Sequence, residues 1–138
     1  MGTVNWAAVL VAGLSAFVIG GVWYSPGLFG KAWMKDNNLD EATIRKGNKG
    51  KIFGFTLVFS LLMAVNLAMF LQDRQPGCGP KTDMAWGIGA GLLTGIWTFC
   101  AIAIHSLFEL KPWRLIFING GYTVVALALM GAIIGAWR

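Results

Sequence analysis

The sequence predicts an all-α integral membrane protein whose single domain, residues 1–138, is a bundle of four transmembrane helices. Charged residues make up 12 % of the chain and hydrophobic residues 57 %, whereas a soluble domain has about 25 % charged residues. Four long segments contain no Asp, Glu, Lys or Arg, and these segments are Val4–Tyr24, Ile52–Gln72, Met84–Phe108 and Leu115–Trp137. At ~1.5 Å per residue, each is long enough to cross the roughly 30 Å hydrocarbon core of a bilayer as a helix.

The backbone of a segment in lipid must satisfy its own hydrogen bonds, so these segments are expected to be helical. We predict helices over 4–24, 52–72, 84–110 and 115–137, with a longer connection at 25–51. The first segment has no Lys or Arg before it, and Trp23 and Tyr24 occupy the place where small residues would mark a cleavage site. We therefore interpret it as a helix and not as a removable signal peptide.

The basic residues of the connections predict the orientation. The basic residues between the first two helices are Lys31, Lys35, Arg45, Lys46, Lys49 and Lys51, and Lys111 and Arg114 lie between the last two. Arg74, Lys81 and Arg138 belong to the opposite side of the membrane. The positive-inside rule therefore places residues 25–51 in the cytoplasm and both termini outside it, in a bacterial cytoplasmic (inner) membrane. A net charge of +5 is then explained by orientation and by contact with membrane lipids, and nucleic acid is not expected as a partner.

The connection 25–51 is predicted to contain two short helices. Leu28, Phe29, Ala32 and Trp33 recur at helical spacing with lysines between them, a pattern typical of a helix lying in the headgroup plane; the alternative is an irregular loop whose aromatic residues belong to the interfacial belt. A second helix is expected over Leu39–Lys46, with Asn38 and Glu41 in a capping arrangement and Gly47 after it. The aromatic residues expected to anchor the chain at the interface are Trp23, Phe29, Trp33 and Trp113.

Two parts of the chain carry recognisable motifs. Residues 23–33 read WYSPGLFGKAW, preceded by Asn5-Trp6, and the second half contains His105-Ser106-Leu107-Phe108-Glu109, Pro112-Trp113, Asn119-Gly120-Gly121-Tyr122 and Met130-Gly131. In these motifs the chain resembles the small integral-membrane family known as domain of unknown function 1761, over nearly its whole length. The resemblance implies a four-helix membrane protein and brings no reaction, substrate or active site.

The third predicted helix has one face that combines small and ionisable residues. At about 100° per residue, the residues that fall on this stripe are Gly87, Gly91, Thr94, Thr98, His105 and Glu109. Ionisable residues at membrane depth are functional candidates, so His105 and Glu109 are predicted to form a protonatable pair at the cytoplasmic end. The alternative is a packing seam that the two residues cap near the surface, where Glu109 pairs with neighbouring basic residues.

Three further polar residues fall at the same depth, and these are Tyr24, Asn119 and Tyr122. We predict that they converge with His105 and Glu109. Alternatively, they hydrogen-bond helices together, which is the usual role of polar side chains in a bundle. Asn66, alone in its helix, is expected to make such a bond between helices.

Small residues at four-residue spacing predict close helix contacts. The third helix carries Gly87, Gly91 and Gly95, and the first carries Ala8, Ala12, Ala16 and Gly20. The fourth helix adds Gly131 and Gly135. Because three of the four helices have such faces, we predict a homo-oligomer.

The residue inventory excludes several chemistries. One histidine supplies neither a bis-histidine haem site nor a zinc site with the usual ligands, so no metal, no cofactor and no enzymatic activity are expected. Two functions remain. The first is an oligomeric transporter or pore-like protein for a proton, cation or small polar solute. The alternative is a structural or accessory membrane protein that binds lipid or a partner through its small-residue seams and its basic connection.

Overall fold

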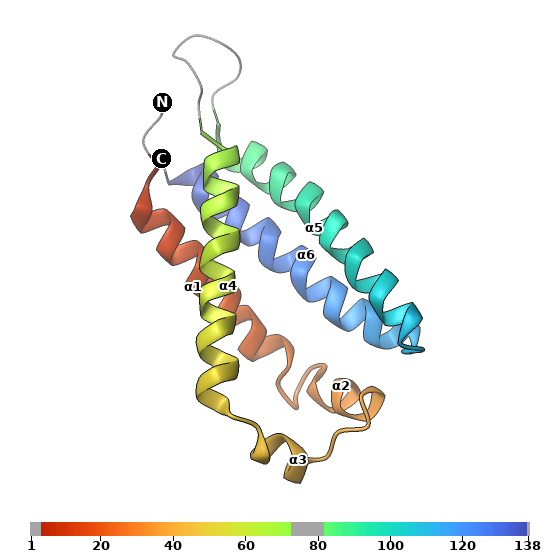
Figure 1. Cartoon of the computed structure of the whole chain (residues 1–138). Helices are drawn as coiled ribbons and strands as arrows, with labels where there is room; N and C mark the ends of the chain where they lie inside the picture. Colours follow the sequence, from red (N-terminus) through yellow and green to blue (C-terminus); the bar gives the residue numbers. More distant parts are fainter. Residues whose placement is uncertain (1–3, 73–81, 138) are drawn as a thin grey trace.

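The computed structural model describes residues 4–72 and 82–137, and these residues form six helices (Figure 1). The helices are α1 (Trp6–Trp23), α2 (Gly30–Asp36), α3 (Glu41–Lys46), α4 (Lys49–Phe70), α5 (Met84–Phe108) and α6 (Trp113–Ala136). Four of them, α1, α4, α5 and α6, are long and apolar enough to span a membrane. The predicted class, an all-α bundle of four transmembrane helices, is confirmed.

The predicted bounds are close, and the differences occur where capping residues fix the ends. α4 begins three residues earlier than expected because the Asn48 side chain accepts a hydrogen bond from the Lys51 backbone N–H at 3.0 Å. α6 begins directly after Pro112 and α5 ends at Phe108, with Glu109 as its C-cap. Asn5 caps α1, where its side chain accepts from the N–H groups of Ala7 and Ala8.

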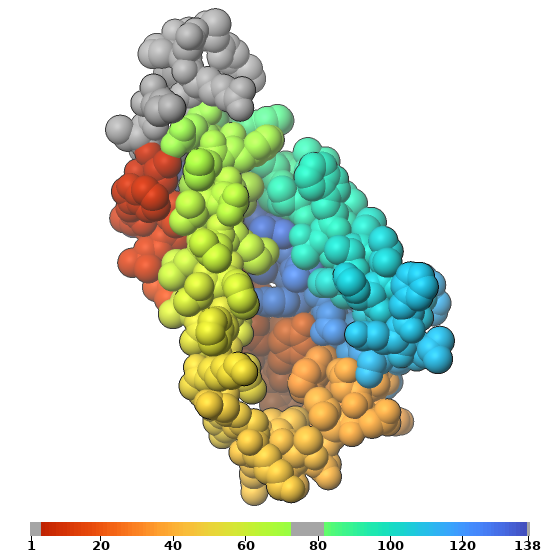
Figure 2. All heavy atoms as spheres, viewed as in Figure 1, coloured from red at the N-terminus to blue at the C-terminus, as the bar shows by residue number. Residues whose placement is uncertain are grey.

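The four long helices are arranged so that α6 and α1 are central. α6 packs along α5 on one side and against α1 on the other, and α4 packs against α1. The two termini lie at one end of the bundle and the short helices α2 and α3 at the opposite end (Figure 1). Towards that end α4 and the α5–α6 hairpin diverge, and the space-filling view shows a hollow between α4 and α5 with α6 behind it (Figure 2).

The contact between α5 and α6 brings the two backbones together. A Cβ atom at Gly91 would collide with the carbonyl oxygen of Leu127, and one at Gly87 with that of Gly131. Gly95 of α5 is buried against Val124 of α6. Because no side chain separates the helices at these positions, the small residues of α5 and α6 are used inside one chain.

The alanine face of α1 is also used inside the chain. Ala8, Ala12 and Ala16 are at most 1 % exposed, and Ala12 and Ala16 belong to a core that includes residues of α4 and α6. Gly20, the last residue of the predicted seam, lies against the Tyr122 ring. The small-residue seams are therefore occupied by packing within one chain. The homo-oligomer stays a prediction, and its interface would have to use another surface.

The connection between α1 and α4 contains the two predicted short helices, with one correction. Asn38 was expected to cap α3, but its φ is 55° and it terminates α2 instead. Its N–H donates to Lys35 O, and the next N–H, that of Leu39, donates to Met34 O, which is the Schellman arrangement that Asn tolerates. Asp40 caps α3, since its carboxylate accepts from the Thr43 N–H at 2.7 Å.

Candidate functional site at the junction of α1, α2 and α6

Polar and aromatic side chains from the end of α1 meet the first turns of α6. The Tyr24 hydroxyl donates to Asn119 Oδ1 at 2.8 Å. The Tyr122 hydroxyl donates to the carbonyl oxygen of Ala16 at 2.9 Å, and the two tyrosine rings lie 5.5 Å apart, edge to face. The predicted convergence of Tyr24, Asn119 and Tyr122 is present in the structure.

The neighbouring tryptophan strengthens the same junction. Trp23 Nε1 donates to the carbonyl oxygen of Ile118 at 2.9 Å, and its ring lies over the open backbone face of Gly121. Phe29 packs against the indole, with ring centroids 4.8 Å apart. These two residues therefore pack within the protein, and their role as interfacial anchors stays a prediction.

Helix α2 is held against the end of α1 by two features and against α6 by a third. A Cβ at Gly30 would collide with the carbonyl oxygens of Tyr24 and Ser25, so the chain can turn tightly into α2 only with glycine there. Trp33 packs edge-on against the Tyr24 ring at 5.9 Å. Asp36 accepts two hydrogen bonds from Arg114, from Nε at 2.8 Å and from Nη2 at 2.5 Å.

The ion pair is the strongest polar link between α2 and α6. Its bidentate geometry suits a guanidinium and a carboxylate, and the Asp36 side chain is only 9 % exposed. The hydrogen bond from Arg114 lowers the pKa of the Asp36 carboxyl below its ordinary value, although burial opposes part of that shift. The pairing of Asp36 with Arg114 was not predicted from the sequence, because nothing local links residues 78 positions apart.

The opposite side of this segment presents unpaired positive charge. Lys31 and Lys35 are exposed on α2, and further exposed lysines follow in α3 and α4; these are Lys46, Lys49 and Lys51. In the part of the chain that the structure describes, the ion pairs are Arg114–Asp36 and Arg45–Glu41. The five lysines therefore have no carboxylate partner among the described residues.

His105 and Glu109 do not join the junction. Both side chains are exposed, and neither takes part in a side-chain hydrogen bond or ion pair among residues 4–72 and 82–137. They lie one turn apart at the end of α5 as expected, but Tyr24 and Asn119 bond each other without them. The neighbouring Ser106 is buried.

The crossing of α5 and α6 explains this difference. Successive contact positions Gly87, Gly91 and Gly95 are four residues apart, so the line of contact turns by about 40° per step around α5. From Gly87 to the buried Ser106 it has turned by about 100°. His105 remains directly above Gly87 on the helix, and by that depth α6 has moved to another face.

The remaining predicted positions are less enclosed. Trp113 is 59 % exposed, and its ring lies against that of Phe117, with ring centroids 6.4 Å apart. Asn66 was expected to bond another helix, but its amide donates to Leu62 O of its own helix at 2.8 Å. That prediction is wrong because the Asn66 side chain lies on an exposed face of α4.

The chemistry of the junction is that of a structural contact between helices. Every buried side-chain nitrogen or oxygen among the described residues has a hydrogen-bond partner, and in the same residues no three of His, Cys, Asp and Glu come together as a metal site. The arrangement holds α2 against the bundle and turns its lysines outward. The motif WYSPGLFGKAW forms one side of it, and Asn119-Gly120-Gly121-Tyr122 forms the other.

The fold and this junction define a membrane protein of four spanning helices with a docked basic helix at one end. A family model described as "Protein of unknown function (DUF1761)" matches residues 7–135. The chain belongs to this family, and the resemblance carried by its motifs is confirmed. No curated protein and no solved structure matches the chain.

Proposed function

We propose that this chain is an accessory membrane protein that binds the headgroups of anionic lipids at the cytoplasmic surface through the basic segment 30–51. The observation that carries the proposal is the docking of α2, which is held by Trp33 and Asp36 on one side while Lys31 and Lys35 are exposed on the other. The proposal includes no catalytic step, cofactor or metal.

The exposed lysines favour lipid binding, and they are stronger support than the interior of the bundle gives for transport. Each lysine near an anionic membrane surface contributes about 1 kcal/mol of attraction, and five exposed lysines without carboxylate partners occupy this segment. The polar residues that were expected to converge with His105 and Glu109 instead satisfy one another, with Tyr24 bonded to Asn119. A fastened helix also presents its charges without the ordering cost that a flexible loop would incur.

The orientation is part of the proposal. It takes residues 25–51 as cytoplasmic and both termini as external, in agreement with the placement of the termini at the end opposite α2 and α3 (Figure 1). A cysteine introduced at Asn48 should resist a membrane-impermeant maleimide applied from outside, whereas Cys78, which lies outside the described residues, should react. Labelling at position 48 from outside would overturn the orientation.

The test of lipid binding compares two variants that lose equal charge. In mild detergent, added phosphatidylglycerol should raise the Tm of the wild type more than phosphatidylcholine does. The double variant Lys31→Gln, Lys35→Gln should lose most of this difference. The control Arg74→Gln, Lys81→Gln removes two positive charges from the other side and should keep it. Equal losses in the two variants would show a nonspecific charge effect and end the proposal.

Transport remains the second candidate, in the form of an oligomeric pore with His105 and Glu109 at its lining. The observation that favours it is their exposure at the end of α5, without side-chain partners among the described residues, which leaves them free to face another copy. This candidate requires a homo-oligomer and a pH-dependent flux in liposomes that His105→Gln abolishes. A monomeric mass with no flux would remove it.

A further inference from the structure

A groove opens sideways between α4 and α5, away from the basic segment. Its volume is about 580 Å³, and α6 contributes Leu127 to its lining. The α4 wall consists of Phe59, Leu62, Met63, Asn66, Leu67 and Phe70, and the α5 wall of Ala90, Leu93, Thr94, Trp97 and Thr98. Leu67, Ala90 and Leu127 are at most 4 % exposed, so the base of the groove is closed.

The groove has the length of one bilayer leaflet. From Phe59 to Phe70 the α4 wall covers about eleven helical steps, or about 16 Å along the helix axis, and half of the hydrocarbon core is roughly 15 Å. Phe70 is the last residue of α4, next to the end of the bundle where the termini lie. The groove therefore runs inward from the leaflet opposite to the one that α2 and the lysines face.

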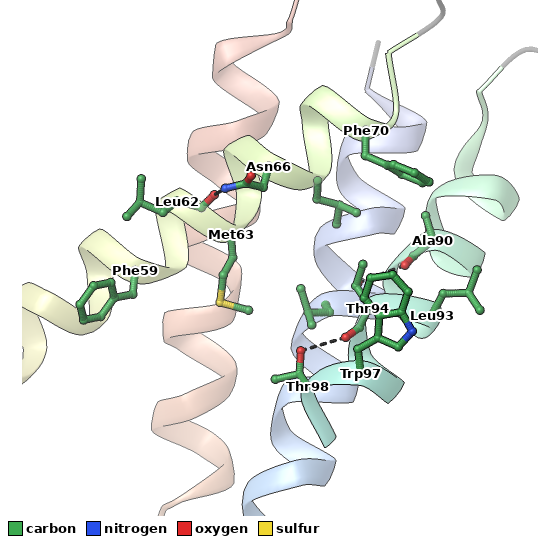
Figure 3. Close-up of a pocket in the computed structure, with 12 residues that line it drawn as sticks. Phe59, Leu62, Met63, Asn66, Phe70, Ala90, Leu93, Thr94, Trp97 and Thr98 are labelled. Carbon is green, nitrogen blue, oxygen red and sulfur yellow. Dashed lines mark hydrogen bonds between the residues drawn. The ribbon is translucent and has the colours of Figure 1, made fainter. Parts of the chain in front are cut away.

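The threonine hydroxyls in the groove are satisfied by their own helix. Thr98 Oγ1 donates to Thr94 O at 2.8 Å (Figure 3), and Thr94 Oγ1 donates to a backbone carbonyl one turn earlier at 3.0 Å. Asn66 uses one N–H for Leu62 O, which leaves its carbonyl oxygen, its other N–H and the exposed Trp97 indole N–H as the polar groups offered to an occupant. Among the described residues no ionisable side chain lines the groove, so the occupant is apolar over most of this length.

The extent of the groove favours a lipid chain over a helix. Its lining on α4 ends at Phe59, about halfway along that helix. A spanning helix would need a contact surface along the whole bilayer, whereas α4 and the α5–α6 hairpin diverge towards α2 (Figure 1). A single extended hydrocarbon chain suits the length of the groove.

We propose that the groove between α4 and α5 binds one acyl chain of a phospholipid from the leaflet on the side of the termini. Lipid tails are as apolar as the groove, so the preference over bulk lipid comes from dispersion contacts with walls on three sides and not from the hydrophobic effect. Phe59, Met63 and Trp97 supply these walls in the inner half of the groove. The site is independent of the proposed binding of anionic headgroups.

The experiment uses a zwitterionic probe, so that the lysines do not contribute. The full chain is reconstituted in nanodiscs with a phosphatidylcholine whose palmitoyl chain carries a mid-chain diazirine, illuminated, and mapped by mass spectrometry. Crosslinks should concentrate on Phe59, Met63 and Trp97, above the level at Phe55 and Ile96, which are similarly exposed outside the groove.

A matched pair of variants on α4 decides the assignment. Met63→Trp fills the groove and should reduce the crosslinks at Phe59 and Trp97 to the level outside it, whereas Met69→Trp, at a 62 % exposed position beyond the lining, should leave them unchanged. Should Met63→Trp fail to fold, Leu93→Trp with Leu92→Trp as its control repeats the comparison on α5. Equal crosslinking inside and outside the groove, or no difference within a pair, overturns the proposal. Disulfide formation between two chains that carry Asn66→Cys would show a helix of a second copy as the occupant and overturn it equally.

Discussion

Helix α6 makes two contacts of opposite character. Towards α5 it offers backbone, and the carbonyl oxygens of Leu127 and Gly131 occupy the space where Cβ atoms of α5 would stand. Towards α1 and α2 it offers side chains, with Asn119 bonded to Tyr24 and Arg114 bonded to Asp36. The contact with α5 requires that Cβ atoms be absent from α5, and the contact with α1 and α2 requires particular polar side chains.

The difference indicates which part of the molecule is able to respond to its surroundings. Backbone packed on backbone has no titratable group and no rotamer to change, so the α5–α6 hairpin is expected to behave as one rigid unit. The α1–α2–α6 junction contains an ion pair and several hydroxyl bonds, whose strength depends on pH and on polar neighbours. The substitutions below are arranged to break one contact while leaving the other intact.

The largest effect is expected at the backbone contact. Gly91→Ala places a methyl group on the carbonyl oxygen of Leu127 and should lower the free energy of unfolding by about 1–3 kcal/mol, the usual cost of overpacking. The control Gly89→Ala lies on the same helix, where nothing stands within 4 Å of the added atom, and should gain about 0.5–1 kcal/mol from helix propensity. Reversible unfolding in mixed detergent measures both. Equal effects would mean that α5 and α6 do not approach as described.

An intermediate effect is expected at the hydroxyl bonds of the junction. Tyr24→Phe removes the donor to Asn119 Oδ1 and should cost about 1 kcal/mol, since it leaves a half-buried acceptor without a partner. Combined with Asn119→Ala, the loss should be smaller than the sum of the two single losses, because both substitutions remove one bond. Additive losses in this double-mutant cycle would show that the bond does not contribute. Trp113→Phe, at an exposed position of the same helix, should be neutral and serves as the control.

The sequence predicts the fold well because the membrane leaves few choices. Charge-free segments of bilayer length must be helices, so the existence of α1, α4, α5 and α6 follows from residue type alone. Their ends depend on caps, and these are less certain, as Asn38 shows. Asparagine both caps helix starts and tolerates positive φ, so its role is determined by which neighbouring helix reaches it.

The site is predicted only in part, for a geometrical reason. Tyr24, Asn119 and Tyr122 were expected together because depth in the membrane can be counted along the chain. His105 was expected with them because it lies above Gly87 on an ideal helix, yet the crossing of α5 and α6 rotates the contact away from it. A crossing angle depends on the shapes of two helices and is not encoded in the periodicity of one. The same limit hides the pairing of Asp36 with Arg114.

A smaller effect, confined to low pH, is expected at the ion pair. Arg114 lowers the pKa of Asp36 from its ordinary value of 3.8, so the pair stabilises the docked α2 above about pH 4 and ceases to do so as the pH falls through the lowered pKa. Hydrogen-exchange protection factors of the α2 amides should therefore fall between pH 5 and about pH 2. Asp36→Asn should show low protection throughout, without this transition.

Two other carboxylates of the same segment, Asp40 and Glu41, serve to test whether the pH dependence of α2 protection belongs to Asp36. The pKa of Asp40 is also lowered, chiefly by its side-chain hydrogen bond with Thr43, so Asp40 is kept unchanged in both variants. Glu41→Gln breaks the exposed pair with Arg45 and should leave the pH profile of α2 as in the wild type, because an exposed pair contributes little. A transition that persists in Asp36→Asn would assign it to another group.

The smallest effect is expected at His105, which belongs to neither contact of α6. Its side chain is exposed while the adjacent Ser106 is 7 % exposed, so two neighbouring residues report on the rotation of the contact. His105→Gln should change the free energy of unfolding by less than about 0.5 kcal/mol, as exposed substitutions usually do. Ser106→Leu should cost about 1–3 kcal/mol, because a larger side chain must be accommodated at a buried position. Unfolding of the two variants in the same detergent, at pH 5 and pH 8, compares them directly. A large loss at His105 with a neutral Ser106 would reverse the assignment of faces and return His105 to the interior, where a proton-linked role would have to be considered again.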